Sequence, residues 1–345
     1  MFGSGEAFRY FQCSECLCLQ IEAPPPDLSD YYPDGYYSYR AVGGRSSLAK
    51  RLLKSVRDDY AVFRTAFIGR LLNVVYPADA RLQSLSRIPL QRDSGILDVG
   101  CGRGELLLTL QGMGFTSLLG IDPFNAEEID YGGGLSIRRE TIHELNGKWD
   151  LVMFHHSFEH VPDPAETLES ASKLLRPGGY CLVRAPVVPS FAWEHYGTNW
   201  VQLEAPRHLF LHSADSIRML AARSHLELVG VVHDSTSFQF WGSEQYLKGI
   251  ALTDERSHGR NPTGSVFSAG QIHEFERRAK HLNAEGQGDQ GAFYLKKTDR
   301  QHTTSVCTRR AWLSRRLHRA LTRPTHPPGQ PLRSRLIRGP PGCPC

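Results

Sequence analysis

The chain contains 345 residues, of which 40% are hydrophobic and 22% are charged, a composition typical of globular proteins. This length fits one large domain with additions or two small domains. No apolar run approaches the roughly eighteen residues of a membrane-spanning helix. The opening MFGSGEAFRYFQC lacks the charged and then apolar pattern of a secretory signal, so we expect a cytoplasmic protein without a membrane span.

The net charge of +4 is unevenly distributed along the chain. Residues 298–345 contain ten arginines and one acidic residue, so residues 1–297 keep 30 of the 40 basic and 35 of the 36 acidic residues. The part expected to fold is therefore mildly acidic, which makes nucleic acid an unexpected partner. The segment 298–345 is rich in Arg and Pro and has little apolar periodicity, and we expect it to be disordered.

The amino-terminal residues 1–40 are rich in Cys, Tyr and Pro and are expected to be irregular. Cys13 and Cys16 form a C-x-x-C pair, and Cys18 follows shortly after. A structural zinc site takes four ligands, and the sequence offers no second pair nearby. We therefore expect three reduced thiols, with a zinc ion at these cysteines as the alternative.

Residues 41–92 are expected to form a helical cap. Within this segment, Phe63, Phe67, Leu71 and Val75 repeat every four residues, and Pro77 ends the pattern. The segment is expected to cover part of a pocket.

Strand and helix patterns alternate over residues 93–297, which predicts a parallel sheet with helices on both faces. Seven strand-like runs occur in this order: GILDVG, SLLGID, LSIRRE, WDLVMFH, YCLVRAP, LELVGVVHD and QGAFYLKK. The helical run DPAETLESASKLL lies between the fourth and the fifth, and Pro-Gly-Gly closes it. We therefore predict an α/β protein with a Rossmann-like, seven-stranded and mostly parallel sheet.

The most informative stretch is ILDVGCGRGELLLTL, residues 96–110, in which a glycine-rich turn joins a predicted strand to a predicted helix. A dinucleotide-binding turn follows the pattern G-x-G-x-x-G. Here Gly100, Gly102 and Gly104 alternate instead, Glu105 follows them, and Asp98 precedes the first glycine. The stretch therefore departs from the dinucleotide pattern, and it contains no P-loop.

A second acid, Asp122, ends the next predicted strand. A carboxylate at this place can accept hydrogen bonds from both hydroxyls of a ribose. The glycines before it allow a ligand without a diphosphate to approach the backbone. The pattern predicts a nucleoside that carries an amino-acid arm.

These motifs resemble those of class I S-adenosylmethionine-dependent methyltransferases. LDVGCGRGELL, GIDP, WDLVMFHHSFEHVPDP and LLRPGGYCLVRAP occur in the family's order over about residues 94–187. NWVQLEAPRHLFLHS and GDQGAFYLKK resemble a bacterial subgroup, of the type 11 and type 23 kind, that acts on small molecules. The resemblance implies S-adenosyl-L-methionine as cofactor, a last strand antiparallel to its neighbours, and a partial zinc ribbon at the C-x-x-C pair.

The resemblance also assigns roles to individual residues of this chain. The methionine part of the cofactor would be surrounded by Asp98, Gly100, Cys101, Gly102 and Gly104. Around the nucleoside and the sulfonium, the ribose would bind Asp122, the adenine would lie between Thr141 and Ile142, and the sulfonium would lie beside His155.

The segment HHSFEHVPDP contains an H-x-x-E-H pattern from His156 to His160. The pattern follows a strand and is interrupted by Pro162, so it lacks the helix of a zinc peptidase. Some quinone-directed relatives hold a divalent metal here with two acids and a histidine. Because His156 stands in the place of the first acid, we predict no metal, and expect Glu159 and His160 to order the turn.

Methyl transfer to a hydroxyl needs a proton acceptor, and histidine titrates near neutrality. The candidate catalytic bases are His156 and His208, with His160 as a third. The Asn/Asp-Pro-Pro-aromatic turn of enzymes that methylate DNA adenine or glutamine is replaced by HHSF, which argues against those substrates.

We therefore predict methyl transfer to a small molecule such as a sugar, a polysaccharide-linked sugar or a secondary metabolite. A quinone-like ring is the alternative acceptor. A non-catalytic S-adenosylmethionine-binding partner protein is the alternative function. A nicotinamide oxidoreductase is disfavoured by Asp98 and Glu105.

Overall fold

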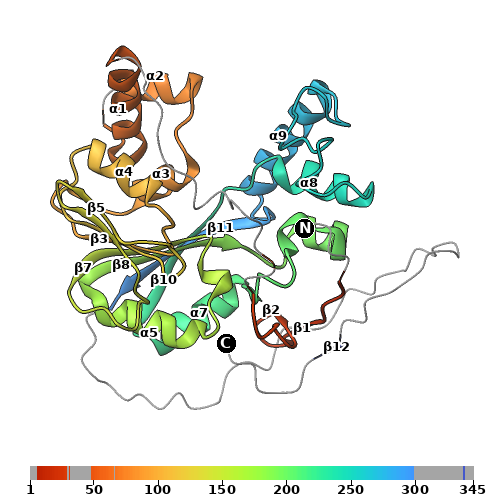
Figure 1. Cartoon of the computed structure of the whole chain (residues 1–345), viewed down its shortest axis with the longest axis horizontal. Coiled ribbons are helices and arrows are strands. Elements are labelled where there is room, and N and C mark those ends of the chain that lie inside the picture. The colour runs from red at the N-terminus through yellow and green to blue at the C-terminus, as the bar shows by residue number, and fades with distance from the viewer. Residues whose placement is uncertain (1–5, 29–30, 32–47, 66, 299–336, 339–345) are drawn as a thin grey trace, which may run out of the picture.

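The structure is a computed structural model that describes residues 6–28, 31, 48–65, 67–298 and 337–338. A central sheet carries helices on both faces, and two helical projections rise from one side of it (Figure 1). The strands of this sheet are β3 (Ile96–Val99), β4 (Leu118–Ile121), β5 (Ile129–Gly132), β6 (Leu135–Arg138), β7 (Trp149–His155), β8 (Leu175–Pro186), β10 (Leu226–His233) and β11 (Gln290–Lys297). The helices are α1 (Leu48–Phe63), α2 (Phe67–Val75), α3 (Ala80–Ser84), α4 (Glu105–Gly112), α5 (Pro164–Leu174), α6 (Phe191–Tyr196), α7 (Ala214–Arg223), α8 (Phe238–Leu247) and α9 (Ala269–Ala284).

The central sheet has the strand order β10-β11-β8-β7-β3-β4-β6-β5 among the described residues. The strands from β8 to β6 in this order run parallel, whereas β11 lies antiparallel between β10 and β8. The predicted mostly parallel sheet with an antiparallel last strand is confirmed. The strand number is corrected from seven to eight, because β5 adds a short edge strand antiparallel to β6. IDYG was not predicted as a strand because it is short and half-exposed.

Helices cover both faces of the sheet and form two hydrophobic cores. One core joins the sheet to α1, α3 and α4, and the other joins it to α5 and α7. Alternate residues of β11 enter different cores: Ala292 and Tyr294 enter the first, and Phe293 and Leu295 enter the second. The strand is therefore buried on both faces.

A second, small sheet contains both ends of the described chain. Its strands β1 (Tyr10–Gln12) and β2 (Leu19–Ile21) form a hairpin that pairs with β9 (Phe210–Leu211) and with β12 (Ile337–Arg338). The amino-terminal segment is thus not wholly irregular, because a backbone hydrogen bond from Cys13 N to Cys18 O closes the hairpin. The tail was expected to be disordered, and its residues Ile337–Arg338 pair with β1. The rest of the tail, 299–336 and 339–345, lies outside the described residues.

The three cysteines of this hairpin, Cys13, Cys16 and Cys18, are buried and form no disulfide. The sulfur of Cys18 lies 3.8 Å from Nδ1 of His212. Among the described residues, no group of three metal-binding side chains includes these cysteines. None of the described helices is both long enough and apolar enough to cross a membrane.

Candidate functional site

The glycine-rich turn lies between β3 and α4, as predicted. Gly100, Gly102 and Gly104 have φ values of 74°, 54° and 76°, a region of the backbone map that favours glycine. A Cβ atom at Gly100 would lie 2.5 Å from Cβ of Ser157, so the turn and the segment after β7 touch each other. The glycines therefore serve both the tight turn and the close approach of the next loop.

Asp122 follows β4 and holds the glycine-rich turn in place through a hydrogen bond. Its Oδ2 accepts a hydrogen bond from Gly102 N at 2.9 Å, and its Oδ1 accepts one from Phe124 N at 2.9 Å. Asn125 Nδ2 donates to Gly102 O at 2.7 Å. Each carboxylate oxygen has a second lone pair, so these bonds leave Asp122 able to accept from ribose hydroxyls.

Asp98 is buried at the end of β3, with Cys101 on the same turn. Burial raises the pKa of Asp98 to about 7, and the nearby charge of Asp122 adds to this shift while that of Arg81 opposes it. Burial likewise raises the pKa of the Cys101 thiol, which is therefore neutral. A cation placed beside Asp98 would favour its ionised form.

The two residues predicted beside the adenine follow β6. The side chain of Glu144 accepts hydrogen bonds from Thr141 N and Thr141 Oγ1, both at 2.7 Å. Ile142 is buried in the core shared with α5 and α7. Thr141 thus begins a turn at the same sheet edge as Asp122, and Ile142 anchors that turn.

His155, the last residue of β7, has an imidazole without hydrogen-bond partners. Both ring nitrogens are buried, and neither has a partner among the described residues. Burial, together with the charges of Arg184 and Arg81, holds the pKa of His155 well below its usual value, so the ring is neutral. The glycine-rich turn and this unpaired ring fit a ligand that brings its own polar groups, as S-adenosylmethionine would.

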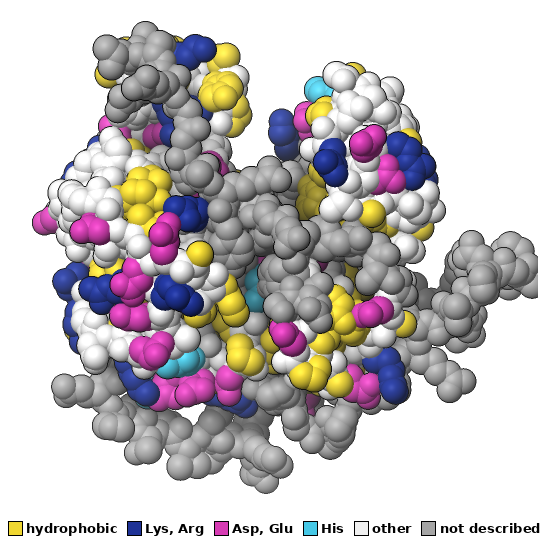
Figure 2. Space-filling model, viewed as in Figure 1, with side chains coloured by type: hydrophobic (Ala, Val, Ile, Leu, Met, Phe, Trp, Pro, Cys, Tyr) yellow, Lys and Arg dark blue, Asp and Glu magenta, His cyan; other side chains and the backbone are white. Residues whose placement is uncertain are grey.

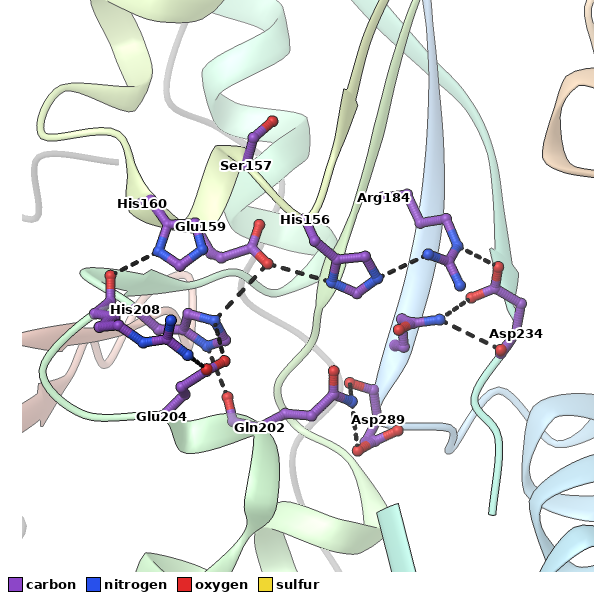
Figure 3. Close-up of polar contacts among 12 residues, drawn as sticks. His156, Ser157, Glu159, His160, Arg184, Gln202, Glu204, His208, Asp234 and Asp289 are labelled. Atoms are coloured by element: carbon purple, nitrogen blue, oxygen red, sulfur yellow. Dashed lines mark hydrogen bonds and ion pairs between the residues drawn. The ribbon is translucent and has the colours of Figure 1, made fainter. Parts of the chain in front are cut away.

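His156 begins the loop after β7 (Figure 3). Its backbone is strained, with φ of 55°. Its Nε2 lies 2.7 Å from Nη1 of Arg184, and Arg184 Nε donates to Asp234 Oδ2 at 2.6 Å. Because arginine only donates hydrogen bonds, Nε2 of a neutral His156 accepts and Nδ1 carries the proton. That proton faces Glu159 Oε1, which lies 3.4 Å from Nδ1.

Glu159, His160 and His208 form a group close to His156, in which Glu159 and His208 are buried and His160 is half-buried (Figure 3). Their ligand-capable atoms lie within 4.8 Å of one another, so this trio could hold a metal ion. Burial would raise the pKa of Glu159, but the hydrogen bond and charge of His156 and the charges of His160 and His208 lower it to about 2. Burial lowers the pKa values of His160 and His208 to about 4.

The position of His208 is fixed by two further contacts. Its Nδ1 lies 2.8 Å from the carbonyl oxygen of Gln202 and therefore donates to it. Its Nε2 lies 2.9 Å from Glu204 Oε2. Because Nδ1 carries the ring proton, Nε2 presents a lone pair to this oxygen. Two acceptor atoms this close require a proton between them. His208 and Glu204 thus form a proton-sharing pair next to Glu159.

Three residues of this site, Arg184, Asp234 and Glu204, were not predicted from the sequence. Arg184 interrupts the apolar strand run YCLVRAP, and a charge in a strand buried on both faces was an available signal. Asp234 lies 50 residues after Arg184 in the sequence and carried no comparable signal. Glu204 lies only four residues before His208, but nothing in the sequence marked it as the partner of that histidine.

The fold is Rossmann-like, and the glycine turn, Asp122 and His155 lie at the same edge of its sheet. Residues 73–231 match the family model of a methyltransferase domain. This match agrees with the methyltransferase motifs of the sequence, which lie within the matched residues.

The chain is similar to two proteins named ubiquinone biosynthesis O-methyltransferase. The one from Marinobacter nauticus is 34% identical over 99 residues, which cover 25% of this chain and 42% of the relative. The one from Colwellia psychrerythraea is 35% identical over 98 residues, covering 25% and 39%. The similarity thus spans about two fifths of each relative.

Among solved structures, the chain is similar to the cyclopropane synthase MmaA2 of Mycobacterium tuberculosis, with 15% identity and a TM-score of 0.41 over 71% of this chain and 98% of that one. A putative sarcosine dimethylglycine methyltransferase of Galdieria sulphuraria gives 15% identity and a TM-score of 0.39, covering 61% and 80%. Similarity at this level carries no argument about the site.

Proposed function

We propose that this protein transfers a methyl group from S-adenosylmethionine to a hydroxyl oxygen of a small molecule. One contact carries the proposal: Ser157 Oγ donates to Val99 O at 2.6 Å. It ties the loop that presents His156 to the strand end where the glycine turn begins. A proton acceptor and a cofactor-binding turn are thereby held together.

The cofactor would be held by the predicted residues. Asp98, Gly100, Cys101, Gly102 and Gly104 would face its methionine part, and the carboxylate of Asp98 suits the positive charge there. The ribose would lie at Asp122, the adenine at Thr141 and Ile142, and the sulfonium beside the neutral ring of His155. When bound, this cofactor supplies an activated methyl group.

His156 is the better placed of the two predicted bases. Its side chain is 29% exposed, whereas that of His208 is 4% exposed. With Nδ1–H directed at Glu159, Nε2 is the basic nitrogen, in the arrangement of a carboxylate-oriented histidine. For Nε2 to take the hydroxyl proton as the acceptor oxygen is methylated, Arg184 Nη1 would first release its hydrogen bond to that nitrogen. Arg184, beside Nε2, would stabilise negative charge that develops on that oxygen.

His208 supports this base from behind in the proposed arrangement. Its Nε2 lies 3.9 Å from Glu159 Oε1, and it shares a proton with Glu204. These contacts fix His208 against Glu159 and so help to hold in place the carboxylate that orients His156. The predicted residue His208 is thus proposed as a positioning residue.

Oxygen is proposed as the methylated atom because the two relatives are named O-methyltransferases. A sugar hydroxyl and a ring hydroxyl of a quinone-like molecule both present such an oxygen. The relatives' names favour the ring hydroxyl as the first acceptor to test.

The test compares His156→Ala with His273→Ala, whose exposed side chain lies on α9. Turnover would be measured with S-adenosylmethionine and a panel of phenols and sugars, and S-adenosylhomocysteine affinity by calorimetry. Loss of the base should reduce kcat by about 10²- to 10⁴-fold with unchanged affinity, and His273→Ala should match the parent. Full activity of His156→Ala would refute its role, and a parent without affinity for S-adenosylhomocysteine would refute the function.

A further inference from the structure

Helix α2 exposes its apolar side chains rather than burying them. The exposed fractions are 72% for Phe67, 65% for Ile68, 52% for Leu71, 73% for Val74, 84% for Val75 and 72% for Tyr76. The spacing of Phe67, Leu71 and Val74 places them on one side of the helix. Hydrophobic side chains are visible on the projection that carries α1 and α2 (Figure 2).

The opposite side of α2 is held against α1 through a glycine. Gly69 is the buried residue of this helix, and a Cβ atom there would lie 2.6 Å from Cβ of Tyr60 and from the carbonyl oxygen of Val56. The contact to α1 is therefore close, and it fixes which side of α2 faces outward. An amphipathic helix in a monomer normally shows the reverse arrangement, with its apolar side on the core.

The charge of this hairpin, defined as residues 48–77 with α1 and α2, differs from that of its surroundings. The hairpin contains six basic and two acidic residues, whereas residues 1–297 as a whole contain more acidic than basic residues. Asp58 is already paired with Arg57 and Lys54, and Asp59 is paired with Arg92. Arg70 is exposed on α2 at the border of the apolar face. The hairpin thus combines an apolar face with a positive charge.

We propose that the hairpin docks on an anionic phospholipid surface. The apolar face of α2 would enter the boundary between headgroups and acyl chains, and Arg70 would lie at the phosphates. Partial insertion of this kind needs no membrane-spanning helix. The proposal does not depend on the proposed function.

Charge complementarity favours an anionic surface over a second copy of the chain. In a two-fold dimer, the same patch faces itself, so Arg70 on one copy would approach the basic hairpin of the other. Burying like charges at such an interface is unfavourable. A phosphate surface instead attracts them, and this attraction weakens with salt.

The test measures sedimentation of the full chain with vesicles of phosphatidylcholine alone or mixed equally with phosphatidylglycerol. Leu71→Asp, at an exposed position, should lower the partition coefficient more than tenfold. Arg70→Glu should lower it about 30-fold at low salt, since it changes the local charge by two units. Matched controls on α8 and α9, Leu247→Asp and Lys280→Glu, should behave as the parent. Any contribution of the Arg-rich tail is common to all of these proteins.

Insertion of α2 itself is measured by tryptophan fluorescence of the Val74→Trp variant with vesicles that carry brominated acyl chains. The bromine atoms should quench the fluorescence of this variant more than that of the parent. Light scattering gives the mass of each protein. Four outcomes would overturn the proposal: equal binding to both vesicle types, equal losses in the hairpin and control variants, no added quenching, or a parent dimer that Leu71→Asp converts to a monomer. The last outcome would assign the face to a second copy.

Discussion

At the scale of single residues, Asp98 combines two demands that oppose each other. It is 4% exposed, and burial raises its pKa to about 7 despite the positive charge of Arg81. A carboxylate in this place suits a cationic ligand, but in the ligand-free protein it is an unfavourable buried charge. Asp98 should therefore cost stability above neutral pH.

The sign of this effect follows from the two pKa values. Because the pKa is higher in the folded than in the unfolded chain, the folded state binds more protons between about pH 4 and pH 7, and the free energy of unfolding falls as pH rises through that window. Asp98→Asn should remove this fall and stabilise the ligand-free protein at pH 8 by up to about 4 kcal/mol. Denaturant unfolding at pH 5 and pH 8 would measure it.

The exposed Asp93 provides the control, since Asp93→Asn should leave the pH dependence unchanged. Asp98→Asn should also weaken S-adenosylhomocysteine binding, so stability would rise while affinity falls. A variant with the same pH slope as the parent would contradict the buried, raised pKa.

The residues of the site differ in how far they could be predicted. The glycine turn and Asp122 follow from local spacing, because strand, turn and helix are contiguous in the chain. The partners of His156 do not: Arg184 is 28 residues away in sequence, and Asp234 is a further 50. Contacts of this kind depend on which strands become neighbours, and a single sequence shows no pairing of that sort.

At the scale of elements, strands were predictable where both faces are buried. The runs that form β3, β4 and β7 are mostly apolar because helices cover both sides of the sheet. β1, β2 and β5 were not predicted, because each is short and also carries polar residues or glycine among its few apolar side chains. α2 was predicted as a helix, but its exposed apolar face was not, because periodicity does not say what covers a face.

We expect the stability of the fold to depend strongly on β11, which lies between β10 and β8. Phe293 is 1% exposed and packs in the core with α5 and α7. Phe293→Ala should lower the free energy of unfolding by about 3–5 kcal/mol. Val229→Ala, at a 49% exposed position on β10, should change it by less than about 0.5 kcal/mol. Equal effects in denaturant unfolding would show that β11 is peripheral to the fold.

At the scale of the whole molecule, the proposed boundaries separate an acidic folding unit from a basic tail. We propose 93–297 as the methyltransferase domain, with 41–92 as its helical cap and 1–40 as a Cys-rich segment. The tail from 298 carries an excess of nine positive charges, so it alone makes the chain basic. Composition predicted this division, whereas the pairing of β12 with β1 could not be predicted from two residues.

A chain that ends at residue 300 tests the tail directly. Its net charge should change from +4 to about −5, because nearly all of the positive excess lies beyond that point. Its melting temperature and S-adenosylhomocysteine affinity should match those of the full chain, because β12 adds only a two-residue pairing to β1. Retention on heparin should disappear with the arginines. A chain that ends at residue 288 lacks β11 and should be insoluble. A large loss of melting temperature in the chain ending at 300 would instead show that the tail packs on the domain and stabilises it.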